Sequence, residues 1–265
     1  MGKEAAVIMV YVLLALLGLM WGGSFYFIKI LLQDFGPWEV TFFRSAMGAL
    51  TLIVLIAAVP AWRAGMNRST PWLTVALVGL LNACIPWALI AFSETRISSI
   101  TASIANATTP LWTLIAGIVL FGLRPHRSQW IGLAAGFAGV VILIRPTDAS
   151  FLNGDVLGIA GMLSATLCYG ISSQLMQHRL RGVSAYVMSL VTLAAGALLS
   201  GGISLSSGPV RWGAILDRET LLALIGLGVF GSGVSYVLFY TIIKKAGAEF
   251  ATLVTYLLPP SAMMW

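Results

Sequence analysis

Charged residues are scarce in this sequence. Only 9% of the 265 residues are Asp, Glu, Lys or Arg, whereas 59% are hydrophobic. An ordinary soluble domain carries about 25% charged residues. The composition therefore excludes a soluble globular domain and indicates a protein whose partner is the lipid bilayer.

Cysteine and histidine are rarer still, with two of each. Cys84 and Cys168 fall inside apolar runs and offer neither a disulfide framework nor metal-ligand spacing. His126 and His178 lie among arginines, and no Ser/His/Asp set is evident. A Gly-x-x-x-x-Gly-Lys-[Ser/Thr] phosphate-binding loop is also absent from the sequence, so direct ATP hydrolysis is not expected. We expect no enzyme, no bound metal and no cofactor.

Long apolar runs are what the sequence has in abundance. A helix needs roughly 20 apolar residues to cross about 30 Å of hydrocarbon. The run that follows Lys3 exceeds the ~7 to 15 apolar residues of a signal peptide, so we expect it to be an uncleaved helix. The nine predicted spans are residues 5–30, 38–60, 72–93, 98–121, 129–145, 154–176, 184–205, 220–242 and 247–265.

The basic residues that give the net charge of +6 alternate between loops. Loops on one side carry Lys3, Arg63, Arg68, Arg124, Arg127, Arg179, Arg181, Lys244 and Lys245. The loops between them are neutral, acidic or balanced in charge. Because cytoplasmic loops are enriched in Lys and Arg, the alternation predicts a multi-pass protein of the bacterial inner membrane with a cytoplasmic N-terminus. Topology thus accounts for the positive charge, and no nucleic-acid partner is expected.

The sequence also repeats itself. The segment "ASIANATTP" (102–110) aligns with "ATLVTYLLP" (251–259), an offset of 259 − 110 = 149, and "WGGS" (21–24) aligns with "YGIS" (169–172). The first half holds five spans, an odd number, so the second half would enter the membrane from the opposite side. We therefore predict an all-α polytopic membrane protein built as a ten-helix inverted repeat (5+5), of which about nine helices are present. Residues 1–147 form the first repeat and 148–265 the second, which we expect to be truncated before its last helix.

Several segments together resemble a known family. They are "LLGLMWGGSFYFIKILL", "ASIANATTPLWTLIAGIVLFG", "SQWIGLAAGFAGVVILI" and "AGAEFATLVTYLLPP", with Arg44 in the second span. In this order they are similar to the EamA-type branch of the drug/metabolite transporter superfamily. The resemblance implies ten helices, cytoplasmic termini and a central cavity lined mainly by helices three, four, eight and nine, with help from one and six. Family members export amino acids, other metabolites or amphipathic drugs. A Gly-Glu pair common in the family is replaced here by Gly122 and Leu123.

Polar residues inside two spans predict a binding region. Ser103, Asn106 and Pro110 share one helical face, and Thr255 and Pro259 repeat it in the last span. Each proline leaves the carbonyl four residues earlier without its usual donor, which frees Asn106 O and Thr255 O. Polar groups in lipid turn toward a bundle interior or a watered cavity. The predicted substrate-binding residues are Trp21, Asn82, Trp87, Ser103, Asn106, Tyr169, Tyr236, Thr252 and Thr255.

Alternative roles stay open for most of these residues. A serine or threonine hydroxyl often bonds to its own helix or joins neighbouring helices. Trp87 and Tyr236 suit cavity walls that bind apolar bodies and cations, and they equally suit packing. Asn106 is the strongest candidate, because a buried amide needs several partners.

Few intramembrane charges are available for coupling. We expect Lys29 and Glu94 to extend toward the membrane interface. Arg44 lies deeper and needs a partner, for which Glu39 is a candidate. Spans four, six and nine offer no mid-membrane carboxylate, which weakens but does not exclude proton or ion coupling.

The predicted function is secondary transport of a small-molecule substrate. We expect an exporter of small metabolites, such as amino acids or amphipathic compounds, that works by alternating access. The alternatives are an integral membrane lipid-modifying enzyme, which needs a catalytic cluster at one membrane face, and a scramblase, which needs polar grooves facing lipid. Substrate identity, coupling ion, direction and oligomeric state are not determined by the sequence.

Overall fold

The described part of the chain is helical throughout. The computed structural model describes residues 3–59, 71–144, 155–262 and 264. No strand occurs within these residues. In chain order the elements are α1 (Lys3–Leu31), α2 (Pro37–Ala58), α3 (Trp72–Gly79), η2 (Leu80–Cys84), α4 (Ile85–Glu94), α5 (Ser99–Asn106), α6 (Thr109–Phe121), α7 (Arg127–Ile144), α9 (Val156–Arg179), α10 (Ala185–Ser207), η3 (Trp212–Leu216), α11 (Arg218–Ile225), η4 (Gly226–Val234), α12 (Ser235–Ala246), α13 (Ala248–Thr252), η5 (Leu253–Tyr256) and α14 (Leu258–Ala262).

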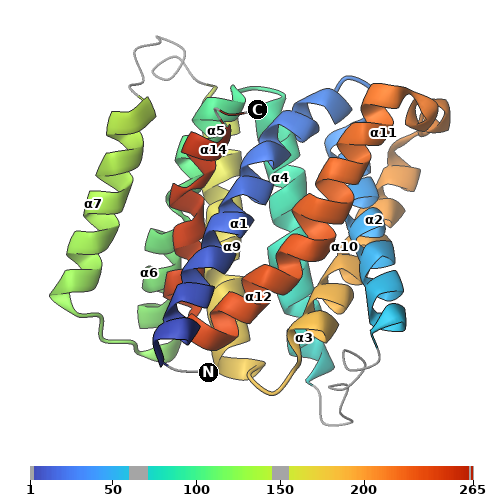
Figure 1. The fold of residues 1–265 in the computed structure, drawn as a ribbon. Helices are drawn as coiled ribbons and strands as arrows, with labels where there is room; N and C mark the ends of the chain where they lie inside the picture. Colours follow the sequence, from blue (N-terminus) through green and yellow to red (C-terminus); the bar gives the residue numbers. More distant parts are fainter. Residues whose placement is uncertain (1–2, 60–70, 145–154, 263, 265) are drawn as a thin grey trace.

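The helices run alongside one another in one bundle, with the two ends of the chain at opposite ends of it (Figure 1). Helix α7 stands at the edge of the bundle. Seven membrane-length apolar helices lie within the described residues, at Val7–Leu31, Pro37–Ala58, Trp72–Glu94, Ser99–Phe121, Val156–Arg179, Ala185–Ser207 and Arg218–Ala246. They confirm seven of the nine predicted spans. The other two predicted spans contain α7 and the short helices α13 to α14.

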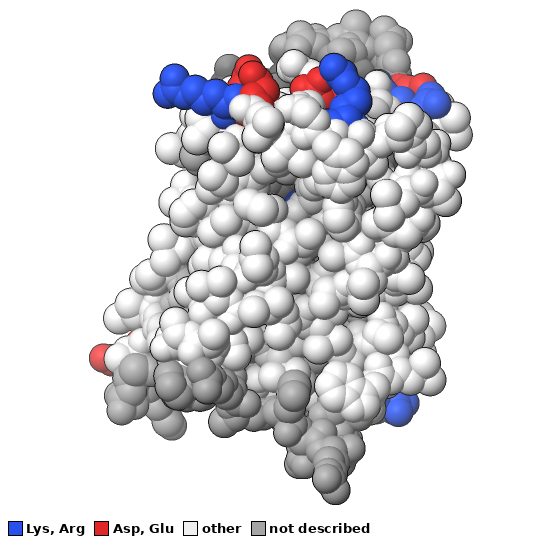
Figure 2. All heavy atoms as spheres, turned by 90° about the vertical axis from the view of Figure 1, so that its right-hand side faces the viewer, with Lys and Arg blue, Asp and Glu red and all other residues white. Residues whose placement is uncertain are grey.

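The surface of the bundle fits a lipid environment. On the face drawn in Figure 2, charged side chains gather at the two ends, and the broad zone between them is uncharged. Large apolar side chains are also exposed on the helices around the bundle, including Val119 (74% exposed), Ile142 (70%) and Leu198 (78%). Exposed apolar surface on this scale is stable in hydrocarbon and not in water.

Two ion pairs bring together loops that we predicted to share one side of the membrane. Arg96 lies 2.8 Å from Asp155, and Arg211 lies 2.9 Å from Asp34. The segments that carry Arg96 and Asp155 therefore lie together, as do those that carry Arg211 and Asp34. This arrangement agrees with the predicted alternation of loops.

Proline breaks the helices where the sequence predicted. Helix α5 ends at Asn106 and α6 begins at Thr109, with Pro110 in its first turn. In the last span, α13 gives way to the 3₁₀ turn η5 before α14, which contains Pro259. Two wider π-helical segments also interrupt spans, and the 149-residue offset carries η2 onto residues 229–233, within η4. The breaks thus recur at related positions, as expected for a repeat, while the complete 5+5 arrangement stays a prediction.

Candidate functional site

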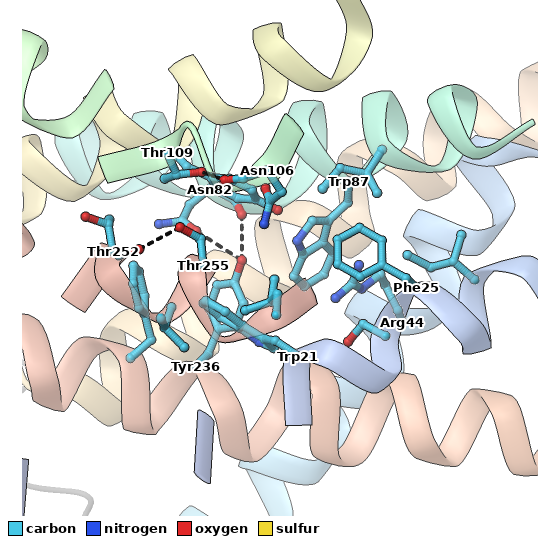
Figure 3. Close-up of a pocket in the computed structure, with 17 residues that line it drawn as sticks. Trp21, Phe25, Arg44, Asn82, Trp87, Asn106, Thr109, Tyr236, Thr252 and Thr255 are labelled. Carbon is cyan, nitrogen blue, oxygen red and sulfur yellow. Dashed lines mark hydrogen bonds between the residues drawn. The ribbon is translucent and has the colours of Figure 1, made fainter. Parts of the chain in front are cut away.

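A cavity lies inside the bundle where the broken helices converge (Figure 3). The space that water molecules can occupy is about 50 Å³, which is room for only a few waters. A metabolite would therefore require the walls to move apart. The lining residues are Trp21, Ser24, Phe25, Ile28, Arg44, Asn82, Trp87, Ile90, Asn106, Thr109, Tyr169, Tyr236, Phe239, Thr252, Val254, Thr255 and Leu258.

The break between α5 and α6 places Asn106 at the cavity. Pro110 has no N–H to donate to the carbonyl of Asn106. That carbonyl instead accepts a hydrogen bond of 2.7 Å from the Thr109 hydroxyl. The Asn106 side chain is 4% exposed, and its Oδ1 atom has no hydrogen-bond partner. The proline therefore creates the break, the neighbouring threonine satisfies the backbone, and the amide remains able to bind a ligand.

Asn82 occupies a similar position in η2. Pro86 leaves the Asn82 carbonyl without its usual donor, and the Tyr236 hydroxyl donates to it over 2.5 Å. The same hydroxyl lies 3.0 Å from Asn82 Oδ1, which orients the amide. The other amide atom, Nδ2, is buried without a partner. A donor from Asn82 and an acceptor from Asn106 are thus both unpaired at the cavity.

Buried polar atoms without partners are uncommon in folded proteins. More than 90% of buried polar groups have a hydrogen-bond partner, so each exception requires an explanation. Here the two amide groups lie on the same side of the Trp87 ring (Figure 3). A bound compound with both a hydrogen-bond acceptor and a donor would satisfy them.

Aromatic side chains form the wall beside these amides. The ring of Tyr236 packs edge-on against Trp87, with centroids 5.3 Å apart, and against Trp21 at 6.1 Å. The Trp21 indole donates a hydrogen bond of 2.9 Å to Ser235 Oγ, which fixes the orientation of the indole ring. Such a wall offers apolar contact area with few freely rotating bonds.

Nine of the seventeen described lining residues were not among the predicted binding residues, and Arg44 is the charged one of these nine. Arg44 of α2 is 5% exposed, and its Cζ atom lies 3.6 Å from the centroid of the Trp87 ring. The Arg44 Nε–H donates a hydrogen bond of 3.2 Å to Ser232 Oγ in η4. Glu39, the candidate partner of Arg44, forms no ion pair with it among the described residues, and the Glu39 carboxylate instead accepts a hydrogen bond of 2.5 Å from the Gly36 backbone N–H. Sequence spacing within α2 gave no signal for partners on α4 and η4.

A second expectation about charges also fails. Glu94 does not extend to the interface but is fully buried. Its Oε2 atom accepts a hydrogen bond of 3.0 Å from the Ser99 hydroxyl. Lys29 donates to the backbone carbonyls of Glu94 and Ile97, so its ammonium is held against the end of α4. The tertiary contact between α1, α4 and α5 encloses a carboxylate that the sequence alone placed near solvent.

Eight of the nine predicted binding residues line the cavity: Trp21, Asn82, Trp87, Asn106, Tyr169, Tyr236, Thr252 and Thr255. Ser103 does not line the cavity, and its hydroxyl donates a hydrogen bond of 2.8 Å to Ile100 O within its own helix. The hydroxyls of Thr252 and Thr255 also bond to backbone carbonyls of the same segment. In the described residues no group of His, Cys, Asp and Glu side chains could hold a metal ion.

Comparisons with known proteins agree with this architecture. An uncharacterized transporter of Archaeoglobus fulgidus is 28% identical over 94% of this chain and 85% of its own length. The inner membrane transporter YedA of Escherichia coli K12, also described as uncharacterized, is 26% identical over 93% of this chain and 78% of its own. The pseudopaline exporter CntI of Pseudomonas aeruginosa is 24% identical over 67% of this chain and 62% of its own.

The fold is shared with a solved crystal structure that superposes with a TM-score of 0.73 at 18% identity, over 99% of this chain and 88% of the other. The sequence profile of the EamA-like transporter family matches residues 8–145 and 156–265, which is nearly the whole chain. Homologues over most of this length are transporters. This chain is a multi-pass membrane protein that belongs to the EamA-like transporter family.

Proposed function

We propose that this protein is a secondary transporter that exports small metabolites, such as amino acids or amphipathic compounds, across the inner membrane. The observation that carries the proposal is the central cavity with its two unpaired amide atoms, Asn82 Nδ2 and Asn106 Oδ1. A site near the centre of the bundle, built from interrupted helices, is typical of secondary transporters.

The arrangement of the cavity supports alternating access as the mechanism. Its lining residues come from both predicted repeats, and the Tyr236 hydroxyl links α12 to the Asn82 carbonyl. In alternating access, one repeat rocks against the other around a fixed site. The small volume of the cavity corresponds to an occluded state, from which opening toward either side would admit substrate.

The predicted orientation assigns each end of the pathway to one side of the membrane. The loops rich in Lys and Arg would face the cytoplasm, with residues 1–147 and 148–265 as the two oppositely oriented repeats. The names of the relatives YedA, an inner membrane transporter, and CntI, an exporter, favour the same location and direction.

A counterflow assay in proteoliposomes tests the proposal. Proteoliposomes that contain the purified protein are loaded with a pooled panel of unlabelled amino acids and amphipathic compounds. Uptake of each labelled compound from outside is then measured. Asn106→Leu removes the unpaired acceptor and should lower exchange about tenfold or more, since a buried polar interaction with substrate is lost. Thr113→Val is the matched control, because Thr113 is buried on α6 but is not among the residues that line the cavity, and its hydroxyl bonds within its own helix to Thr109 O at 2.9 Å.

The outcome also separates transport from the alternative functions. A compound class whose exchange depends on Asn106 and not on Thr113 would support a transporter. Movement of a fluorescent phospholipid between leaflets of the same vesicles, without exchange of any solute, would contradict it and favour a scramblase.

A further inference from the structure

Arg44 is a buried cation to which the described residues bring no carboxylate at ion-pair distance. Its side chain lies in the membrane-spanning helix α2 and lines the cavity with 5% exposure. The ion pairs within the described residues join other partners, Arg96 with Asp155 and Arg211 with Asp34. Burying an unpaired charge is costly, so a buried cation normally holds an anion.

The neighbours of Arg44 hold it in place and leave most of its donors free for another group. The guanidinium stacks on the face of Trp87, with Cζ 3.6 Å from the ring centroid. Its bond to Ser232 Oγ uses the Nε–H, one of five N–H donors. A guanidinium fixed by stacking presents its terminal donors in a planar fork that matches a carboxylate.

The other charges near Arg44 do not neutralise the region. Glu94 on α4 is close enough to interact electrostatically with both Lys29 on α1 and Arg44 on α2. One carboxylate therefore faces two cations. The remaining titratable groups that face Arg44 are the hydroxyls of Tyr169 on α9 and Tyr236 on α12, which are neutral near pH 7. This part of the bundle carries a net positive charge.

The cavity separates this positive charge from the amide pair. Among the described residues that line it, Arg44 is the only charged one. Figure 3 shows Arg44 on one side of the Trp87 ring and both Asn82 and Asn106 on the other, with Trp21 and Tyr236 along the same wall. A compound with an anionic end and an apolar or aromatic body fits Arg44 and the aromatic wall, and a further polar group that reaches the amides would add to its binding.

We propose that Arg44 binds the carboxylate of the transported compound, and that the substrates are amphipathic carboxylates rather than amphipathic cations. This inference rests on the proposed transport function and narrows it to one substrate class. A phosphate would bring nearly two charges to a single guanidinium, so a carboxylate matches the site better. A cationic substrate would place its charge beside Arg44 in a region of low dielectric, where repulsion is strong.

Three probes with the same aromatic body test the charge preference directly. They are 3-phenylpropionate, 3-phenylpropionamide and 3-phenylpropylamine, each added to purified wild-type protein in detergent and to the counterflow assay. We expect the acid to raise the unfolding temperature and to exchange at least about tenfold better than the amide, as for charge-assisted hydrogen bonds. The amine should do neither.

Variants at Arg44 separate substrate recognition from packing. Arg44→Gln should reduce the preference for the acid over the amide to within about twofold, and Arg44→Lys, which keeps the charge, should retain part of it. Arg211→Gln is the matched control, because Arg211 is 69% exposed and pairs with Asp34 outside the cavity. If Arg44→Gln is unstable, the wild-type preference and the Arg44→Lys variant still decide the question.

The outcomes distinguish this inference from the proposed function. Exchange of the amide or amine as fast as the acid would overturn the carboxylate assignment while transport stands. An acid preference unchanged in folded Arg44→Gln would overturn it too, since Arg44 would then serve packing alone. Stabilisation by the acid that depends on Arg44, without exchange of any compound, would support the binding assignment and contradict transport. Absence of stabilisation and of exchange for the acid would overturn the assignment.

Discussion

Gly170 provides a sharp test of the packing beside the cavity. It lies in α9, next to the cavity residue Tyr169, where α9 meets α6. A Cβ atom at Gly170 would lie 2.7 Å from Trp112 C, 2.8 Å from Thr113 N and 2.9 Å from Trp112 O. All three atoms belong to the backbone, so no side-chain rotation could relieve the contact. Gly170→Ala must therefore move one helix away from the other.

The magnitude follows from these distances. Ordinary van der Waals contact begins at 3.4 Å, so the separation from the nearest atom, Trp112 C, must grow by about 0.7 Å (3.4 − 2.7). Overpacking of this kind costs about 1–3 kcal/mol. Replacing glycine by alanine inside a helix stabilises the folded state by roughly 0.5–1 kcal/mol, which offsets part of this cost. We therefore expect Gly170→Ala to lower the free energy of unfolding by about 1–2 kcal/mol and to reduce exchange, since the shift reaches Tyr169.

The matched control is Gly139→Ala. Gly139 lies in α7, and a Cβ atom there would meet nothing within 4 Å. The same chemical change should leave stability unchanged or raise it slightly, because only the helix propensity differs. Denaturant unfolding in detergent, followed by tryptophan fluorescence, compares the two. If Gly170→Ala were as stable as Gly139→Ala, the close approach of α6 and α9 would be refuted.

Two further perturbations follow from single contacts. Tyr236→Phe removes the donor to Asn82 and should lower the free energy of unfolding by about 1–2 kcal/mol, because a buried carbonyl loses its partner. An unchanged free energy of unfolding in denaturant unfolding in detergent would contradict this. The pKa of Asp155 is held below its ordinary value, first by the Gly158 backbone N–H and then by Arg96. The ionised Asp155 carboxylate therefore stabilises the folded state above about pH 4, and this stabilisation is lost as the pH falls further. In thermal unfolding between about pH 3 and 6, Asp155→Asn should remove that part of the pH dependence, and an unaltered profile would refute the assignment.

The breaks in the helices follow from local chemistry, which is why the sequence could predict them. Proline lacks an N–H wherever it stands, so Pro110 interrupts the helix at Asn106 regardless of what packs against it. A buried amide such as Asn106 must face other polar groups or a cavity, because lipid offers no hydrogen-bond partner. These constraints act within one helix, and Asn106 and Thr255, the residues four positions before the two prolines, line the cavity as predicted.

The local environment of a hydroxyl was harder to predict. Ser103 and Asn106 share a helical face, but a serine hydroxyl can satisfy itself on the carbonyl one turn back, as Ser103 does with Ile100. An asparagine amide has too many donors and acceptors to do so. The helical pattern therefore identified the face, and the chemistry of each side chain determined which residue remained available.

The sequence by itself determined the membrane location, seven of the spans and the positions of the proline breaks, because hydropathy, length and backbone chemistry are local properties. Only the tertiary structure decided the partners of the charges. Arg44 stacks on Trp87 of α4 and bonds to Ser232 of η4, while Glu94 is enclosed where α1 meets α5. Such contacts join segments far apart in the chain, and the energy of a buried charge depends on what those segments bring to it.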